Sequence, residues 1–160
     1  MATIEQMPLW LRASLKIYPW RRVDPVPCSP LRKPISESRV ALVTTAGFVP
    51  RGEVPFDKRI RGGDCSYRVI SADANVQTLA EFHRSASFDH AGIEKDRNLA
   101  LPLERLRELA RAGEIGEVAP HHLSFMGSIT APGRLIKRTA PDAARLLVES
   151  KVDIALLVPV

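Results

Sequence analysis

The chain is poor in the residues that cross-link, export or anchor a protein. It has two cysteines among 160 residues, and Cys28 and Cys65 lie far apart without a CxxC pair, so we predict no disulfide framework. Its apolar runs are too short to span a bilayer, and the opening MATIEQMPLW has neither the basic start nor the apolar segment of a signal peptide. We therefore expect a cytoplasmic protein that makes no membrane contact.

Several well-known functional signatures are also missing. The sequence has no P-loop, dinucleotide fingerprint, GxSxG or HExxH motif and no metal-spaced cysteine set, so we expect no bound metal. The net charge is +5, and residues 1–34 carry six basic side chains against two acidic ones. A basic segment can bind nucleic acid or an acidic partner, but no helix-turn-helix, zinc-finger or RNA-binding signature is present. We expect no nucleic-acid partner.

The distribution of proline divides the chain into two parts. Six of the thirteen prolines lie within residues 1–34, where they disfavour regular structure. We predict an extended, Pro-rich basic arm over 1–34, in which Trp10, Tyr18 and Trp20 either pack the arm or mark a partner surface. Residues 35–160 are long enough to form a single domain with its own core.

Hydrophobic patterning predicts an α/β fold for residues 35–160. Strands are expected in SRVALVTTAG (38–47) and YRVIS (67–71), and helices in LPLERLRELARAG (101–113) and TAPDAARLLVESK (139–151), the second with a Thr139–Asp142 capping box. The apolar run VDIALLVPV (152–160) predicts a strand covered on both faces. Alternating strands and helices favour a Rossmann-like or doubly wound, mostly parallel sheet.

Two groups of residues are candidates for a site. His83, Asp89 and His90 form a His/Asp cluster that can orient an imidazole for acid–base chemistry or bind a metal, or they are ordinary polar loop residues. Thr44, Thr45 and Gly47 end the first predicted strand, where hydroxyls and amides can hold a carboxylate or phosphate, although threonine also simply favours strands.

Other polar residues are less suggestive. His121 and His122 are adjacent, which suits a shared metal poorly, so a structural or surface role is expected. Cys65 follows Asp64, whose charge opposes a reactive thiolate, while Arg61 offsets it. Residues and spacing alone indicate a soluble α/β domain and no particular activity.

A series of stretches in order resembles one family. These are PLRKPISESRVALVTTAG, GDCSYRVI, FHRSASFDH, DRNLALPLERLRELARAGEIGEVAPHHLSFMG and TAPDAARLLVESKVDIALLVPV, which span about residue 30 to the last residue. Together they resemble the selenoprotein B family of glycine, sarcosine, betaine and D-proline reductases, and its shorter members most closely. The resemblance places Thr44, Thr45, Gly47 and Asp64 as substrate-binding candidates and His83, Asp89 and His90 as catalytic candidates.

The resemblance also implies a redox pair outside the quoted chain. In the family, the stretch matching LLVPV is followed at once by a selenocysteine or cysteine, then two residues, then a cysteine. We therefore expect the chain to be truncated just before this motif, with Val160 followed by a UGA codon read as stop. A natural truncation and a split gene are the alternatives.

The resemblance implies a reductase component that cleaves an amino acid or amine derivative reductively. The expected partners are other subunits of the complex, a thioredoxin-like dithiol donor and a small amine or amino-acid substrate. The expected redox group is selenocysteine or cysteine, and the quoted chain holds no cofactor of its own. Two other classes stay open, a non-catalytic partner-binding subunit and an α/β domain that binds a small carboxylate.

Overall fold

The structure, a computed structural model, describes residues 7–18, 22–85, 88 and 90–160. Its contacts divide the chain into two units, Met1–Pro30 and Leu31–Val160, which are described separately below. The boundary between residues 34 and 35 that we drew from proline content stays a prediction.

The amino-terminal unit contains a helix, so the prediction of an extended arm is wrong for part of it. Helix α1 spans Leu9–Ile17, and Pro8 stands at its N-cap. The nine helical residues contain no proline, so nothing in them breaks the helix. Trp10 is 71% exposed and Tyr18 is 46% exposed, and Trp20 lies outside the described residues, so packing of the arm through these aromatics stays a prediction.

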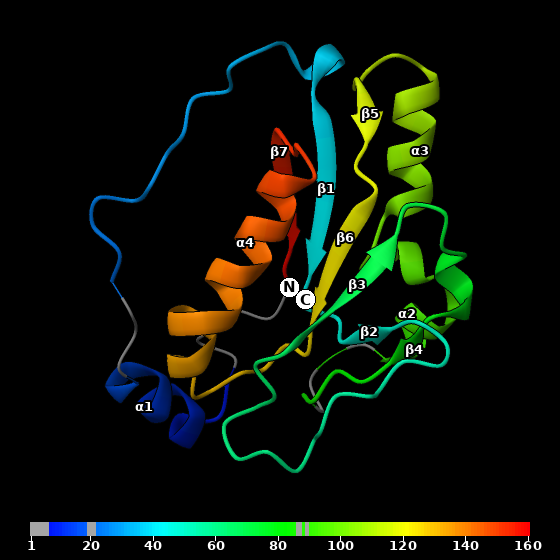
Figure 1. Cartoon of the computed structure of the whole chain (residues 1–160). Coiled ribbons are helices and arrows are strands. Elements are labelled where there is room, and N and C mark those ends of the chain that lie inside the picture. The colour runs from blue at the N-terminus through cyan, green and yellow to red at the C-terminus, as the bar shows by residue number, and fades with distance from the viewer. Residues whose placement is uncertain (1–6, 19–21, 86–87, 89) are drawn as a thin grey trace. The chain divides into compact units, whose positions relative to one another are not determined.

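The second unit holds the sheet and its covering helices (Figure 1). Its strands are β1 (Arg39–Thr44), β2 (Phe48–Val49), β3 (Tyr67–Ser71), β4 (Ala80–Glu81), β5 (Glu117–Val118), β6 (His121–Phe125) and β7 (Ile154–Val158). Its α-helices are α2 (His90–Lys95), α3 (Leu103–Arg111) and α4 (Ala140–Glu149). Single turns are η2 (Ile35–Glu37), η3 (Val76–Thr78) and η4 (Arg97–Leu99), and η5 (Leu135–Thr139) is a π-helix.

Strand β1 is the centre of the main sheet. It pairs in parallel with β7 and with β5 and β6, while β3 adds to β6 in antiparallel orientation. A separate two-stranded sheet joins β2 and β4. The predicted mixed α/β class is confirmed, whereas the Rossmann-like or doubly wound topology stays a prediction.

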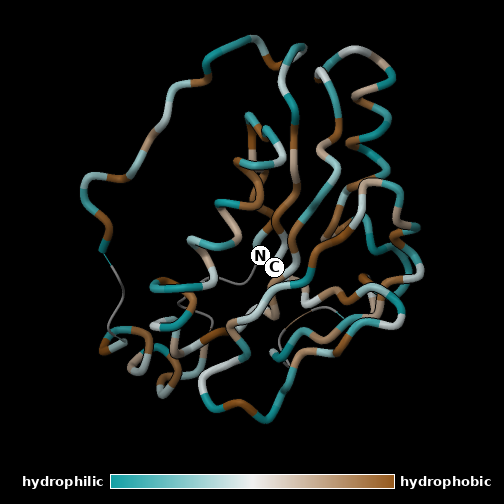
Figure 2. The backbone as a smooth tube through the Cα atoms, in the orientation of Figure 1, coloured by the Kyte–Doolittle hydropathy of each residue, from teal (hydrophilic) through white to brown (hydrophobic). Residues whose placement is uncertain are grey.

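Both faces of β1 are covered, because successive side chains of a strand point to opposite sides. Val40 and Leu42 pack in a cluster with α3 and with Ile70 of β3. Ala41 lies in a second cluster, which contains Leu147 of α4. Apolar and polar residues alternate along α3 and α4, as Figure 2 shows, so each helix has an apolar stripe for the sheet.

The side chain of His122 accepts a backbone hydrogen bond from β1 at a place where the strand pairing is interrupted. Val40 pairs with Val118 of β5 and Val43 with Leu123 of β6, so two extra residues are inserted between these pairs. The backbone N–H of Leu42 donates to Nδ1 of His122 at 2.9 Å, and His122 is fully buried. This placement agrees with the structural role expected for it.

Strand β7 forms where expected, but it is not covered on both faces. Among the described residues β7 pairs only with β1, and Leu156 and Leu157 are 46% and 67% exposed. Its start is fixed to the start of β1, because the carboxylate of Asp153 accepts from the backbone N–H of Arg39 at 2.7 Å and pairs with Lys33 at 2.7 Å. The face that carries Ile154 and Val158 packs against the core, whereas the face that carries Leu157 is not covered by the described residues.

The helices differ from expectation mainly at their ends. The predicted Thr139–Asp142 capping box is absent, because η5 runs directly into α4 and leaves Thr139 with helical backbone angles. Gly113 ends α3 with a φ of +74°, as its position predicted. Within the part of the chain that the structure describes, no helix is both long and apolar enough to cross a bilayer.

Burial of His122 predicts a loss of stability in mild acid. Burial lowers the pKa of His122 from 6.5 to about 4, and the positive charge of Arg107 adds to this effect. Between pH 6.5 and about 4 the unfolded chain binds a proton on His122 that the folded chain does not bind. The free energy of unfolding therefore has its full contribution from His122 above pH 6.5 and loses it as the pH falls towards 4. Urea unfolding should show a loss of about 2 kcal/mol between neutral pH and about pH 5 from this residue.

His122→Asn is the matched test, because the Asn side-chain oxygen can still accept from Leu42 but does not titrate. This variant should lose that part of the pH dependence, whereas His121→Asn should keep it. Equal pH dependence in both variants would show that His122 is not the titrating group.

Candidate functional site

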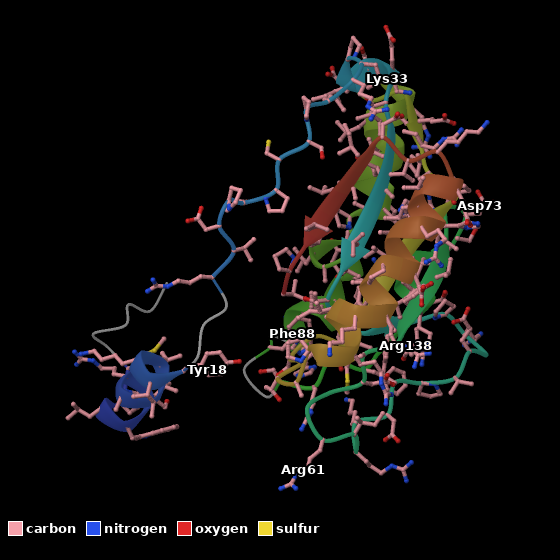
Figure 3. The ribbon with its side chains drawn as sticks, turned by 60° about the vertical axis from the view of Figure 1, so that its left-hand side comes forward. Tyr18, Lys33, Arg61, Asp73, Phe88 and Arg138 are labelled. Atoms are coloured by element: carbon pink, nitrogen blue, oxygen red, sulfur yellow. The ribbon has the colours of Figure 1, made fainter. Side chains whose placement is uncertain are left out.

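Three parallel strands end at the same edge of the sheet, and their loops are joined there. Ligands of open α/β sheets bind outside this carboxyl edge. After β1, the backbone N–H of Thr45 donates to the Val158 carbonyl of β7 at 3.2 Å. The N–H of Gly47 donates to the Phe125 carbonyl of β6 at 2.8 Å. Figure 3 shows Phe88 at this end of the sheet and Lys33 at the other.

Gly47 brings His83 to this edge. The Gly47 carbonyl accepts from the N–H of Phe82 at 2.9 Å, and a Cβ on Gly47 would lie 2.7 Å from the backbone nitrogen of His83. The φ of Gly47 is +68°, a conformation that side chains disfavour. Gly47 was predicted to bind substrate; the structure places it in backbone contact with the segment that carries His83.

Gly127 provides the surface on which the His83 ring lies. A Cβ at this position would lie 2.4 Å from Nε2 of His83 and 2.3 Å from the Thr45 carbonyl oxygen. The His83 ring also stacks on Phe88, with 4.2 Å between ring centroids. His83 is only 4% exposed as a result.

The hydrogen bonds of His83 determine where its proton lies. Nδ1 accepts from the backbone N–H of Ser85 at 3.2 Å, so a neutral ring carries its proton on Nε2. Burial lowers the pKa of His83, and the carboxylate of Glu81 opposes this shift. The Val160 carbonyl also favours the protonated ring, but it makes no hydrogen bond of normal geometry with it. Nε2 is thus a buried N–H donor without a hydrogen-bond partner among the described residues.

The surroundings of His90 shift its pKa in the opposite direction to that of His83. Its Nδ1 lies 2.7 Å from Oε2 of Glu81, and its Nε2 lies 3.1 Å from the Ser85 carbonyl oxygen. Both neighbours are hydrogen-bond acceptors, so they favour the protonated ring, in which both nitrogens donate. The hydrogen bond to Glu81 raises the pKa of His90, and the Ser85 carbonyl adds to the shift. Oε1 of Glu81 accepts from the backbone N–H of His83, so one carboxylate holds both histidines.

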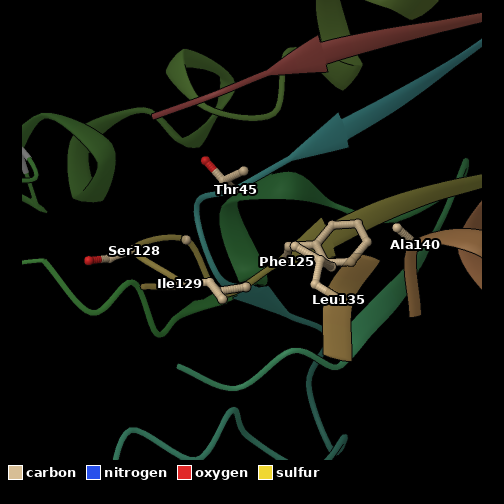
Figure 4. Close-up of a pocket in the computed structure, with 7 residues that line it drawn as sticks. Thr45, Phe125, Ser128, Ile129, Leu135 and Ala140 are labelled. Atoms are coloured by element: carbon tan, nitrogen blue, oxygen red, sulfur yellow. The ribbon is translucent and has the colours of Figure 1, made fainter. Parts of the chain in front are cut away.

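Two pockets flank this cluster. The histidine pocket has a volume of about 270 Å³ and is lined by His83, Ser85, Phe88, Ser128 and Val160. The apolar pocket, drawn in Figure 4, has a volume of about 310 Å³ and is lined by Thr45, Phe125, Gly127, Ser128, Ile129, Leu135 and Ala140. Oγ1 of Thr45 contacts both the N and the O of Val160, at 3.0 and 3.2 Å, and so fixes the end of β7 beside the histidine pocket.

Two of the predicted site residues are engaged elsewhere. Thr44 is fully buried, and its hydroxyl accepts from the N–H of Ala46 at 3.1 Å. Asp64 holds the loop before β3, since its carboxylate accepts from the backbone N–H groups of Asp57 and Ser66, at 3.0 and 2.9 Å. Neither residue lines one of the two pockets.

The remaining candidates can be placed only in part. Asp89 lies outside the described residues. Cys65 is buried and Cys28 is exposed, and both are free thiols. No group of three or more His, Cys, Asp or Glu side chains suited to a metal ion occurs in the described part of the chain.

Several residues of the site were not found from the sequence, among them Glu81 and Gly127. Glu81 stands two residues before His83, and a carboxylate so close to a histidine was an available signal. Gly127 follows the end of β6, but a single glycine does not reveal which side chain will approach it. The role of Gly127 becomes recognisable only when distant segments are brought together.

The carboxylate of Glu81 should keep the pKa of His90 above its ordinary value. Replacing Glu81 with Gln removes the carboxylate that stabilises the imidazolium, so the pKa of His90 should fall towards its ordinary value. An NMR titration of the imidazole protons measures this directly. Glu94→Gln on the exposed side of α2 is the control and should leave the pKa of His90 in place. An unchanged His90 pKa in Glu81→Gln would refute the assigned ion pair.

Gly127 should tolerate alanine far less well than Gly113 does. Both have a positive φ, +72° and +74°, but an added Cβ meets nothing within 4 Å at Gly113. Gly113→Ala should cost about 1 kcal/mol for the backbone conformation alone. Gly127→Ala must also displace the His83 ring or the Thr45 carbonyl, and should cost about 2 kcal/mol more. Urea unfolding measures both, and equal losses would contradict the close approach at Gly127.

Comparison with known sequences identifies a family. The family described as "Glycine/sarcosine/betaine reductase selenoprotein B" matches residues 13–159. The D-proline reductase subunit gamma of Acetoanaerobium sticklandii is 36% identical over 130 residues, which are 81% of this chain and 51% of the relative. The sarcosine reductase complex component B subunit beta of Peptoclostridium acidaminophilum is 31% identical over 145 residues, 88% of this chain and 32% of the relative.

A third relative gives the same result. The glycine reductase complex component B subunit gamma of Symbiobacterium thermophilum is 30% identical over 144 residues, 88% of this chain and 32% of the relative. The chain thus spans about half the length of the first relative and about a third of the other two. No solved structure matches the chain. The match covers nearly the whole chain and confirms the resemblance drawn from its sequence blocks: the chain belongs to the glycine/sarcosine/betaine reductase selenoprotein B family.

Proposed function

We propose that this chain is a component of a cytoplasmic reductase that cleaves the C–N bond of an amino acid or related amine. One observation carries the proposal: His83 lines a pocket at the carboxyl edge of the sheet, and its buried Nε2–H has no hydrogen-bond partner among the described residues. The relatives, named as subunits of D-proline, sarcosine and glycine reductases, support the reaction class.

In this proposal His83 binds the substrate carboxylate. A neutral imidazole with its proton on Nε2 is a donor that keeps its proton, so it suits an anionic oxygen better than a leaving amine. The ring of His90 lies 6.5 Å from the His83 ring, centroid to centroid, and its contact with Glu81 holds the segment that carries both histidines. His83 would therefore hold and orient the carboxylate, while Glu81 positions both histidines.

The proposed reaction consumes two electrons. In the cleavage of a primary amine, the C–N bond breaks, the carbon takes up hydrogen and the nitrogen leaves as ammonium. A dithiol supplies two electrons and two protons and becomes a disulfide. In this proposal the redox pair, a selenocysteine or cysteine and a second cysteine, follows the stretch that ends at Val160. A selenol or thiol there would supply a nucleophile, and Thr45 holds that end of β7 beside the histidine pocket.

The proposed partners are the other subunits of the reductase complex and a thioredoxin-like dithiol donor. Helix α1 offers one place for a protein contact. None of its residues is buried, Leu9, Trp10 and Ile17 are more than 70% exposed, and Arg12 and Lys16 add positive charge. This helix favours, as a second candidate, a partner-binding role for the chain.

Removal of the His83 donor should weaken catalysis through substrate binding. His83→Phe keeps the stacking on Phe88 but loses the N–H, so kcat/KM should fall about 10- to 100-fold, mostly through KM. The measurement uses the full-length gene product assembled with its partner subunits, a dithiol donor, and glycine, sarcosine, betaine or D-proline. His121→Phe is the matched control at a histidine outside both pockets.

The gene sequence beyond the Val160 codon provides a second test. A UGA or cysteine codon next in frame, with a further cysteine codon after two more residues, would support the redox role. Unrelated sequence at that place, together with no amine cleavage by the assembled complex, would refute it and favour the partner-binding role.

A further inference from the structure

The apolar pocket is lined mainly by hydrocarbon side chains from separate elements. Phe125 ends β6, Leu135 begins η5, Ala140 begins α4, and Ile129 lies in the loop between β6 and η5. Figure 4 shows Phe125, Leu135 and Ala140 side by side, with Ile129 nearby. A volume of about 310 Å³ with such a lining suits a hydrocarbon group of several carbons.

The apolar pocket and the histidine pocket adjoin each other. Ser128 lines both. Gly127 lines the apolar pocket, and its Cα is so near the His83 ring that an added Cβ would lie 2.4 Å from Nε2. Thr45 also lines the apolar pocket and is hydrogen-bonded to Val160, which lines the other. A ligand with a short connection between its polar and apolar parts can reach both.

The histidine pocket, which adjoins the apolar pocket, suits a ligand that carries a hydrogen-bond acceptor. His83 is 4% exposed, and its Nε2 lacks a hydrogen-bond partner among the described residues. A buried donor without an acceptor is costly, so such donors usually face a ligand or an ordered water. The next pocket contains no comparable polar group apart from the hydroxyls of Thr45 and Ser128.

We propose that the two pockets form one substrate site for an amino acid with a branched hydrocarbon side chain about the size of that of leucine. The carboxylate binds Nε2 of His83, and the side chain fills the apolar pocket. The inference depends on the proposed function for the cleavage of the amine. It adds a side-chain preference, because glycine or sarcosine would leave the apolar pocket without a hydrocarbon group.

Two carboxylates test the site without turnover. Acetate and 4-methylpentanoate are what glycine and leucine become when hydrogen replaces the amino group. Each buried methylene adds about fourfold in affinity, so 4-methylpentanoate should bind the full-length protein at least about tenfold more tightly than acetate. An NMR titration that follows the amides of Gly127 and Ser128 measures both affinities.

Ala140→Leu places a larger side chain in the apolar pocket. It should reduce the affinity for 4-methylpentanoate about tenfold and leave that for acetate unchanged. Ala144→Leu, one turn along α4, is the matched control, because Ala144 is also exposed but does not line the pocket. His83→Phe should weaken both carboxylates by a similar factor. Equal affinities for the two carboxylates, or equal effects of Ala140→Leu on both, would overturn the proposed site.

The outcomes separate this inference from the proposed function. If the assembled complex cleaves glycine, and the two carboxylates bind equally, the side-chain preference is wrong and the reductase role stands. If 4-methylpentanoate binds more tightly and responds to Ala140→Leu, but no amino acid is cleaved, the pocket assignment stands and the reductase role fails.

Discussion

The candidate site depends on the close approach of two backbones and one imidazole at Gly127. The carbonyl of Thr45 after β1 and the ring of His83 both lie where any other residue would carry its Cβ. Since core packing transmits changes of a few tenths of an ångström, a side chain there would separate the three segments. The absence of one methyl group thus lets residues far apart in the sequence form a single edge with two adjoining pockets.

The two histidines at this edge are made different by their neighbours. Ser85 contributes its N–H to Nδ1 of His83 and its carbonyl to Nε2 of His90, so one residue contacts both rings. Glu81 favours the protonated form of His90 and accepts from the backbone N–H of His83. Burial lowers the pKa of His83, so a less basic ring lies beside the His90–Glu81 pair.

Local sequence patterns predicted where strands and helices form, but they predicted less well what packs around each element. The apolar run Val40–Val43 predicted a buried strand, and Gly113 predicted the end of α3, because both depend on neighbouring residues. The apolar run of β7 has the same composition as a covered strand, yet its burial depends on which elements pack on its two faces. Sequence alone did not contain that information.

The tertiary surroundings of the site residues were likewise not contained in the sequence patterns. The His/Asp cluster singled out His83, which lines a pocket, and its catalytic role stays a prediction. The rule that sites gather at the carboxyl edge singled out Thr44, Thr45 and Gly47, of which Thr45 lines a pocket there. It did not show that the hydroxyl of Thr44 is turned inward, although alternation along the strand makes one of two neighbouring threonines point away. Nor did it show that Asp64 serves its own loop, because hydrogen bonds of that kind depend on the turn geometry.

Strand β7 is held at both ends, by Asp153 at the start of β1 and by Thr45 at its finish. A strand extends by about 3.3 Å for each residue and resists stretching. The number of residues between these two attachments therefore fixes the position of Val160 relative to β1. Substitutions of its exposed leucines preserve that length. A single inserted or deleted residue would displace Val160 from the histidine pocket by about one residue step, even though the strand itself lies at the open edge of the sheet.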